Sequence, residues 1–192
     1  MSKFSNPSSR APGESSRYVR DLLELLGDRD PLEVQRCLIP ELRTLLAGLS
    51  DARLRRPEAP GKWSILMVLD HLVDQELVTG YRLRAVVAEP EPELRGYDQD
   101  SWAQRLRYGQ ADAEVLLEEL DVLRRRNLRL LAALEPGEWA RAGRHAERGP
   151  ESVARLTALM AGHDLVHRAQ IARIRDAAGP PAGDLAQSGG PA

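Results

Sequence analysis

The sequence is short of cysteine, of aromatic residues and of long hydrophobic runs, and each shortage excludes a class of protein. Its single cysteine, Cys37, cannot form an intrachain disulfide or a cysteine-based metal site, and we expect it to be a small buried apolar side chain. Aromatic residues make up only 4% of the chain, too few for the stacking platforms that bind single-stranded nucleic acid. No stretch approaches the ~20 apolar residues of a membrane span, and no apolar run resembles a signal peptide. We therefore expect a cytoplasmic protein without a membrane partner.

The overall composition predicts one helical globular domain. The net charge of −2 over 192 residues gives no basic surface for nucleic acid, so no nucleic-acid partner is expected. Hydrophobic residues make up 42% of the chain, and the abundance of leucine and alanine favours helices over strands. Segments 1–14 and 179–192 are rich in Ser, Pro and Gly and are expected to be disordered tails. Residues 15–178 are the predicted domain.

Helical spacing and capping residues predict an all-α four-helix bundle with one or two extra N-terminal helices. Ser15 or Ser16 is the expected start of the first helix, and Ser64 is a good N-cap for a long one. Pro40 lacks the N–H that a helix needs and is expected to divide two short helices. The loop at 135–150 has room for a short hairpin. The predicted helices cover about 15–27, 31–39, 40–49, 64–88, 111–134 and 151–177.

The stretch "HDLVH" places His163 and His167 four residues apart on the last helix, and hence on one face of it. Steps of three and four carry the apolar stripe from Met160 through both histidines to Ile171, so both rings should point into the core. Asp164, between them, is expected on the charged, exposed face. Two polar rings on a core face need partners, because an unsatisfied buried polar group costs ~1–3 kcal/mol.

His71 is the natural third member of this group, because it lies near the inward edge of the helix at 64–88. Three neutral imidazoles could bind one metal ion and leave a coordination position open, as catalytic sites do. The competing interpretation is that each histidine is a hydrogen-bonded core residue without a metal. From the pattern alone, both interpretations remain. His145, in the long loop, is better suited to line a pocket than to bind the ion.

Three stretches, "GKWSILMVLDHLVDQE", "GYDQDSW" and "GHDLVHRAQI", resemble the DinB-like, YfiT-like superfamily of bacterial four-helix-bundle proteins. The resemblance covers about residues 40–175. It implies an up-down-down-up helix order, frequent dimers, and one divalent metal, zinc or nickel, bound by His71, His163 and His167. Three imidazoles alone suit zinc, nickel, copper and iron.

The members of this superfamily differ in the reaction that they catalyse. Some members of the superfamily are thiol S-transferases, so this chain would be a transferase in which the metal-bound thiolate of a low-molecular-weight thiol attacks an electrophile. The alternatives are a hydrolase using metal-bound water and a non-enzymatic metal-binding stress or detoxification protein. The partners expected are a small-molecule substrate, a thiol and a second copy of the chain. The leucines at 22–26 exceed what one helix face can hide, so the first helix should cover either the bundle or a dimer partner.

Several further residues are candidates for the site. Asp74 lies one turn after His71 and could orient a ligand ring or act as a base; an exposed carboxylate paired along its helix is the alternative. Gln170 lies one turn beyond His167, where it could face the pocket or bond to backbone. Tyr97 and Asp98 follow the second long helix, where a pocket rim could form.

Overall fold

Amphipathic helices dominate the structure, and their apolar sides meet in a bundle. The computed structural model describes residues 12–177, with side chains from Arg17 onward. The expected disorder of 1–14 and 179–192 therefore falls outside the described residues, except that residues 12–14 lie in the first helix. The elements are α1 (Pro12–Leu26), α2 (Pro31–Leu46), α3 (Asp51–Arg55), α4 (Ile65–Ala88), β1 (Glu93–Leu94), α5 (Gln99–Arg105), α6 (Ala113–Ala132), the 3-10 helix η1 (Pro136–Ala140), β2 (Ala142–His145), β3 (Gly149–Ser152) and α7 (Val153–Ala177).

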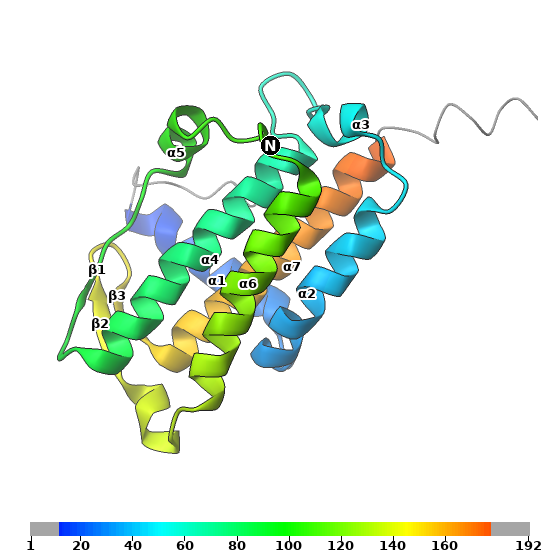
Figure 1. Cartoon of the computed structure of the whole chain (residues 1–192). Coiled ribbons are helices and arrows are strands. Elements are labelled where there is room, and N and C mark those ends of the chain that lie inside the picture. The colour runs from blue at the N-terminus through cyan, green and yellow to red at the C-terminus, as the bar shows by residue number, and fades with distance from the viewer. Residues whose placement is uncertain (1–11, 178–192) are drawn as a thin grey trace, which may run out of the picture.

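Helices α2, α4, α6 and α7 form the four-helix bundle. Along the chain α2 rises, α4 and α6 both descend and α7 rises again, so the predicted up-down-down-up order is confirmed (Figure 1). Helix α2 packs mainly against α7, and α4 packs against both α6 and α7. The predicted cap of α4 is confirmed, because the Ser64 hydroxyl accepts the Met67 N–H at 3.4 Å. The pairing of α4 with α7 decides which histidines meet.

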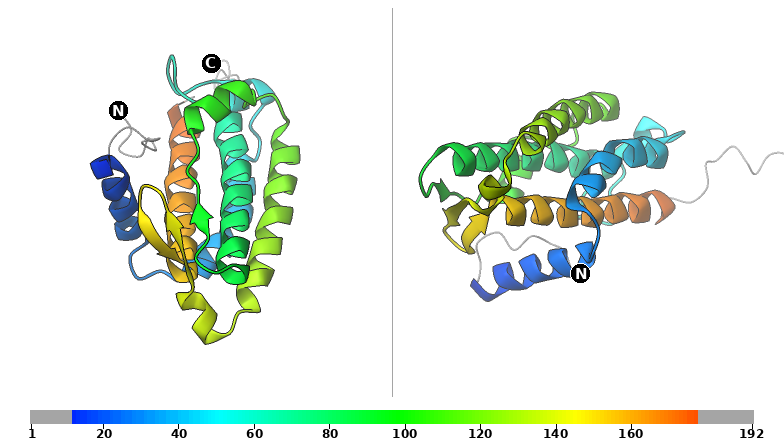
Figure 2. Two further views of the ribbon diagram at one scale, coloured as in Figure 1. Left: turned by 90° about the vertical axis from the view of Figure 1, so that its left-hand side faces the viewer. Right: turned by 90° about the horizontal axis from the view of Figure 1, so that it is seen from below.

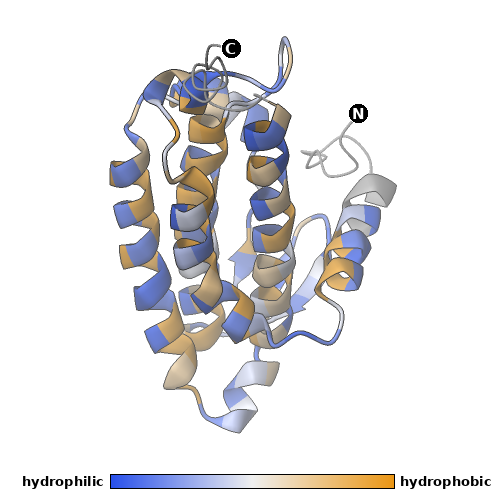
Figure 3. Cartoon of the chain, turned by 90° about the vertical axis from the view of Figure 1, so that its right-hand side faces the viewer, coloured by the Kyte–Doolittle hydropathy of each residue, from blue (hydrophilic) through white to orange (hydrophobic). Residues whose placement is uncertain are grey.

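The helices turn their hydrophobic sides toward one another (Figure 3). Leu66 and Leu69 of α4 are buried as predicted, together with Leu120 of α6. Leu77 was predicted on the same stripe but is 53% exposed, because it is rotated away from both neighbouring helices. Cys37 is also exposed, contrary to its predicted burial, since the buried side of α2 follows other positions: Gln35, Leu38, Ile39, Leu42 and Leu46.

The prediction that Pro40 divides two helices is wrong. Helix α2 continues through Pro40 from Pro31 to Leu46 and supplies the first helix of the bundle. Proline deprives the carbonyl of Arg36, four residues earlier, of its helical N–H partner. Both Arg36 and Pro40 are exposed, so water can satisfy that carbonyl. The apolar side of the same helix stays packed in the core, and this burial outweighs the lost bond.

Helix α1 lies outside the bundle, alongside α7 (Figure 2, right). Its Val19 and Leu22 pack against Leu159 and Val166 of α7. The two backbones approach so closely that a Cβ atom on Gly162 would lie 2.5 Å from the carbonyl oxygen of Leu22. Leu22 and Leu26 of this helix are therefore buried in their own chain, one of the two roles expected for these leucines, whereas Leu25 is exposed. Helix α1 is thus the one predicted extra N-terminal helix, and the short α3 lies later in the chain, between α2 and α4.

The connection between α4 and α6 has to return along the whole bundle, because both helices descend. Residues 89–112, here called the crossing segment, run along the side where α4 and α7 meet and include β1 and α5 (Figure 2, left). Strand β1 pairs in parallel with β2, and β2 pairs with β3 in the predicted hairpin. In residues 12–177 no helix has the length and apolar character needed to cross a bilayer.

Candidate metal centre

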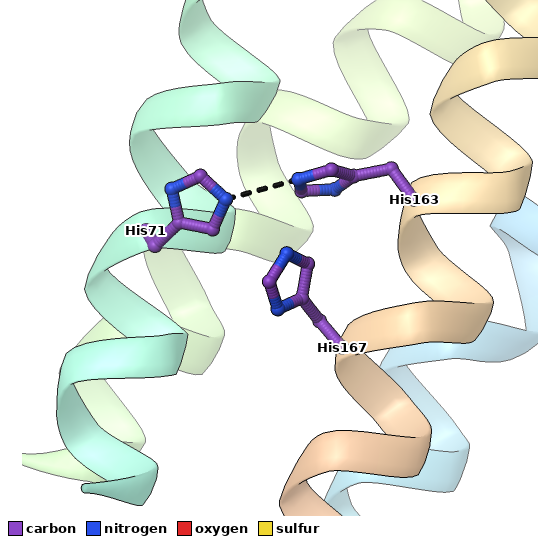
Figure 4. A group of neighbouring side chains, drawn as sticks. All are labelled: His71, His163 and His167. Carbon is purple, nitrogen blue, oxygen red and sulfur yellow. Dashed lines mark hydrogen bonds between the residues drawn. The ribbon is translucent and has the colours of Figure 1, made fainter. Parts of the chain in front are cut away.

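The bundle brings His71 of α4 together with His163 and His167 of α7 (Figure 4). One ring nitrogen of each residue lies within 4.8 Å of the others, and all three side chains are buried. The ring centroids are 5.0 Å apart for His71 and His163, 4.7 Å for His71 and His167, and 4.3 Å for the two histidines of α7. The inward direction predicted for the three rings is what the structure shows.

His71 and His163 share one hydrogen bond, with their Nε2 atoms 2.9 Å apart. One of the two nitrogens must donate a proton and the other must accept it. The Nδ1 atoms of both rings are buried and have no hydrogen-bond partner among the described residues. Each of the two rings therefore has one nitrogen with a hydrogen-bond partner and one nitrogen without a partner among the described residues.

His167 is oriented by the next turn of its own helix. Its Nδ1 lies 2.8 Å from Oε1 of Gln170, an acceptor, so Nδ1 carries the proton and Nε2 carries the lone pair. Gln170 thus lies where the sequence placed it, beside the last histidine. On the other side, the ring of Trp63 lies 5.4 Å from that of His71. The Gln170 amide therefore restricts the ring of His167, and the Trp63 indole restricts the ring of His71.

Burial keeps all three imidazoles neutral. Desolvation lowers the pKa of His71 and His163 well below the ordinary value, and the neighbouring rings lower it further. Desolvation lowers the pKa of His167 to about 4, although the bond to Gln170 opposes this. A neutral imidazole has a lone pair available for a metal ion, whereas a protonated one does not.

The donor set fits a divalent cation. Three neutral imidazoles offer three lone pairs, and the bond between His71 and His163 satisfies only one of them. An ion bound to all three rings would satisfy every lone pair at once. Imidazole nitrogen is a suitable ligand for zinc, nickel, copper and iron. Three protein ligands leave one position of a four-coordinate ion for a small molecule.

Asp74 lies against the crossing segment rather than against a histidine. Its Oδ2 accepts a short hydrogen bond from the Tyr108 hydroxyl, and the ring of Tyr108 lies 6.1 Å from that of Trp63. Burial and the bond to Asp74 raise the pKa of Tyr108, so its hydroxyl keeps the proton. The Asp74 carboxylate is thus bound by Tyr108. The role of orienting a histidine ring, which was one expectation for Asp74, falls to Gln170 instead.

Tyr97 and Asp98 occupy different environments although they are adjacent. The Tyr97 hydroxyl donates to Oε1 of Gln75 at 2.8 Å, so it contacts the turn of α4 that follows His71. Asp98 is exposed, and its oxygens accept the N–H groups of Asp100 and Ser101 at the start of α5. The Tyr97 hydroxyl thus lies about one turn of α4 from His71, and Asp98 caps the N-terminus of α5.

His145 lies apart from the three histidines, in strand β2 opposite Leu94 of β1. Its side chain is 1% exposed, and its Nδ1 accepts the N–H of Glu147 at 3.2 Å. Its imidazole is not among those whose ligand atoms cluster. The structure therefore separates His145 from the metal centre, as the sequence interpretation preferred.

The sequence interpretation missed a buried ion network beside the metal centre. Asp164 is 1% exposed rather than on the surface, and both its oxygens accept hydrogen bonds from Arg124, at 2.6 and 3.0 Å. Arg124 also donates to Glu76 at 2.9 Å. Burial raises the pKa of Asp164 to about 6, against the attraction of Arg124. One signal was available: Arg124 falls on the same stripe as Leu120, Asn127 and Leu131.

Comparisons with known proteins identify a family and related proteins. A family model of the DinB superfamily matches residues 38–171. A protein of Bacillus mycoides named "Putative metal-dependent hydrolase" is 29% identical over 167 residues, which cover 87% of this chain and 95% of that protein. A protein of Oceanobacillus iheyensis with the same description is 27% identical over 133 residues, covering 69% of this chain and 77% of the relative.

A solved structure shares the fold. It is that of YfiT from Bacillus subtilis, described as "a probable metal-dependent hydrolase with an unusual four-helix bundle topology". The TM-score is 0.70 with 21% sequence identity, over 93% of this chain and 95% of that one. The family match spans most of the described residues and includes all three clustered histidines. The chain belongs to the DinB superfamily.

Proposed function

We propose that this chain is a metal-dependent enzyme in which His71, His163 and His167 hold one divalent cation, zinc or nickel. The observation that carries the proposal is the convergence of three buried, neutral imidazoles on one point. A divalent cation bound there supplies positive charge that lowers the pKa of a thiol or a water molecule, so that the nucleophilic anion forms near neutral pH.

The reaction we propose first is transfer of a low-molecular-weight thiol to a small electrophile. The thiol loses its proton, a bond forms between sulfur and the electrophilic carbon, and the leaving group departs with the electron pair of its bond. Asp74 is the proposed proton acceptor. Its Oδ2 is occupied by the Tyr108 hydroxyl, which leaves Oδ1 to take the proton. The resemblance to thiol transferases of the same superfamily supports this choice.

Hydrolysis is the second candidate. The names of the curated relatives favour it, and the same three histidines and the same carboxylate would serve a water nucleophile. Water would lose a proton to Asp74, and its oxygen would form a bond to the carbonyl carbon of an ester or amide. The bond from that carbon to the alcohol oxygen or amine nitrogen would then break, and the leaving group would depart with the electron pair and take the proton from Asp74. The third candidate is a metal-binding stress or detoxification protein without catalytic activity.

Conjugation and hydrolysis assays distinguish these candidates. Metal-loaded protein is mixed with a chromogenic electrophile and bacillithiol, mycothiol or glutathione, and in parallel with a panel of esters and amides and no thiol. Thiol transfer predicts turnover only in the first set, and replacement of Asp74 by Asn should reduce kcat while metal content stays the same. Turnover of the second set alone would establish hydrolysis. The absence of turnover in both sets would favour the non-catalytic metal-binding protein.

The homodimer remains a prediction, and so does the cytoplasmic location. The leucines of α1 no longer support a dimer, because Leu22 and Leu26 are buried in their own chain. Other large apolar side chains support it instead, on the outer sides of the paired helices α4 and α6: Leu77, Tyr81, Val115 and Val122. Sedimentation of the wild type and of a Tyr81→Glu variant tests the dimer. A wild-type monomer would exclude it.

A further inference from the structure

His145 carries a buried hydrogen-bond donor that the protein leaves unused. Its Nδ1 accepts the N–H of Glu147, so the ring proton must be on Nε2. Nε2 is buried and has no acceptor among the described residues. A buried donor without a partner is destabilising, so it marks a place where an acceptor would bind favourably.

Arg82 of α4 presents a second unused donor at the same level of the small sheet. Its side chain is 5% exposed, one terminal nitrogen donates to the carbonyl of Arg95, and its Nε has no partner among the described residues. Arg95 directly follows Leu94, the residue of β1 that pairs with His145. The guanidinium and the imidazole therefore flank the same end of β1.

Arg82 is within electrostatic reach of Arg148 and of two carboxylates, Glu147 and Glu151. Glu151 is fully buried nearby, but both its oxygens bind Arg148, at 2.8 and 2.9 Å. Arg82 forms no ion pair with any residue that the structure describes. Burial lowers the pKa of His145, Arg148 and Arg82 lower it further, and Glu151 opposes them. A buried arginine without a direct ion pair is unusual, because buried charges are normally paired.

This region is connected to the metal centre by one face of α4. Gln75 lies one turn after His71. Arg82 lies eleven residues after His71, about 16 Å along the helix axis and on nearly the same side of the helix. Between them the Tyr97 hydroxyl donates to Gln75. Burial raises the pKa of Tyr97, and the charge of Arg82 opposes this, so the two side chains are within electrostatic reach. Gln75 and Arg82 thus lie on nearly the same side of α4 as His71, with Tyr97 bound to Gln75 between them.

We propose that Arg82 and His145 form an anion-recognition site for the far end of the molecule that reacts at the metal centre. The ligand class is a small molecule with a carboxylate or phosphate about three helical turns from its reacting atom. Arg82 Nε and His145 Nε2 would each donate one hydrogen bond to the anion, and Arg82 would supply the compensating charge. Only the assignment of the anion to a substrate rests on the proposed function; the anion site itself does not.

Anion binding is tested directly with succinate as the probe and the uncharged succinamide as its control. Calorimetry on metal-loaded protein should show saturable binding of succinate alone. Arg82→Gln and His145→Phe should each weaken it by about tenfold or more, which corresponds to a lost charge-assisted hydrogen bond. Arg144→Gln is the matched control, because Arg144 adjoins His145 on β2 and is exposed. Its affinity for succinate should equal that of the wild type.

Two further variants separate binding at this site from binding at the metal ion and from a disturbed fold. Succinate could bind the metal ion instead, so titration is repeated with a His163→Ala variant, which should keep its succinate affinity. Arg82→Gln could disturb the crossing segment by losing the bond to Arg95, so Arg82→Lys, which keeps the charge, should retain part of the affinity. Equal weakening by Arg144→Gln, or binding lost only in His163→Ala, would overturn the proposal, as would no saturable binding.

The source of the anion is distinguished by kinetics. One arm compares glutathione with its diethyl ester at a fixed electrophile, and the other compares an electrophile with and without a carboxylate at a fixed thiol. Arg82→Gln should abolish the preference for the charged molecule in one arm only. The thiol carries the recognised anion if the first arm responds, and the electrophile carries it if the second does. If succinate binds as expected while both arms are inactive, the proposed reaction fails and the anion site stands.

Discussion

The Nε2 atoms of His71 and His163 lie 2.9 Å apart, although the two residues are 92 positions apart in the sequence. The contact exists because α4 and α7 run side by side in opposite directions. It leaves the Nδ1 atoms of both rings without a partner among the described residues, so the core holds two unsatisfied polar atoms beside His167. Three neutral imidazoles meet here and the shared bond uses only one of their lone pairs, so a candidate cation site is part of the folded core.

Metal content should depend on all three clustered histidines. We expect about one divalent ion per chain in elemental analysis of the purified wild type. Alanine at position 71, 163 or 167 should remove most of it, because two imidazoles hold an ion far more weakly than three. His145→Ala is the control and should keep wild-type occupancy, since His145 lies in β2, apart from the cluster. A His163→Ala protein that retained its metal would refute the proposed site.

Metal-free protein should lose stability as the pH falls from about 6.5 toward 4. Burial lowers the pKa of His167 to about 4 in the folded chain, whereas an unfolded histidine titrates near ~6.5. Between these values the unfolded chain binds a proton that the folded chain does not, so the free energy of unfolding rises with pH. The stability from this group is complete above the unfolded value and declines below it.

Urea unfolding at several pH values measures this effect in protein treated with a chelator. In a His167→Gln variant the fall between pH 6 and 5 should be smaller by about 1 kcal/mol per pH unit, the contribution of one proton. Asp164, whose pKa is raised to about 6, acts in the opposite direction in both proteins and cancels in the comparison. Parallel pH profiles for the two proteins would show that His167 is not buried and neutral.

Removal of Arg124 should destabilise the chain strongly. An Arg124→Met variant leaves Glu76 and Asp164 buried without their counterion, a change that costs about 3–5 kcal/mol. Arg125→Met is the matched control, because Arg125 is 69% exposed in its pair with Asp121 and should cost less than about 1 kcal/mol. Chemical unfolding measures both.

A triple variant separates charge from packing in the same network. When Arg124→Met is combined with Glu76→Gln and Asp164→Asn, no charge remains buried in the network, so part of the lost stability should return. If the triple variant is less stable than Arg124→Met alone, the loss of stability comes from poor packing of the methionine and not from the unpaired carboxylates.

The close contact between α1 and α7 should be sensitive to one methyl group. In Gly162→Ala the new Cβ would meet the backbone of Leu22 at 2.5 Å, so α1 must shift outward, and overpacking of this kind costs about 1–3 kcal/mol. Limited proteolysis between α1 and α2 should become faster. Gly137→Ala, where no atom lies within 4 Å of the new Cβ, should behave as wild type. Equal proteolysis rates in the two variants would contradict the close approach.

The sequence predicted the elements that depend on local periodicity. Apolar steps of three and four located α4 and α7, and the same steps placed His163 and His167 on the inner face. The helix order could not come from periodicity, because it depends on how distant segments pair; it came from the resemblance. Pro40 was misjudged because local propensity was weighed without the burial that holds α2 together.

The remaining errors concern charged residues in the core and contacts of the crossing segment. Asp164 was placed on the surface because a carboxylate alone favours water, and its partner Arg124 is forty residues away. The contact between Tyr108 and Asp74 was not foreseen, since residues 89–112 have no helical period that would fix their direction. Long-range pairing of polar groups was the information missing from both predictions.

The crossing segment also bears on how this protein architecture can diversify. A bundle whose second and third helices descend together must carry a long connection past the metal centre, whatever reaction it performs. This connection reaches the site through single side chains such as Tyr97 and Tyr108, while the histidines stay on the helices. Loops tolerate replacement and length changes far better than packed helices do. Evolution can thus change this connection in one contiguous stretch of chain and leave the three histidines unaltered on their helices.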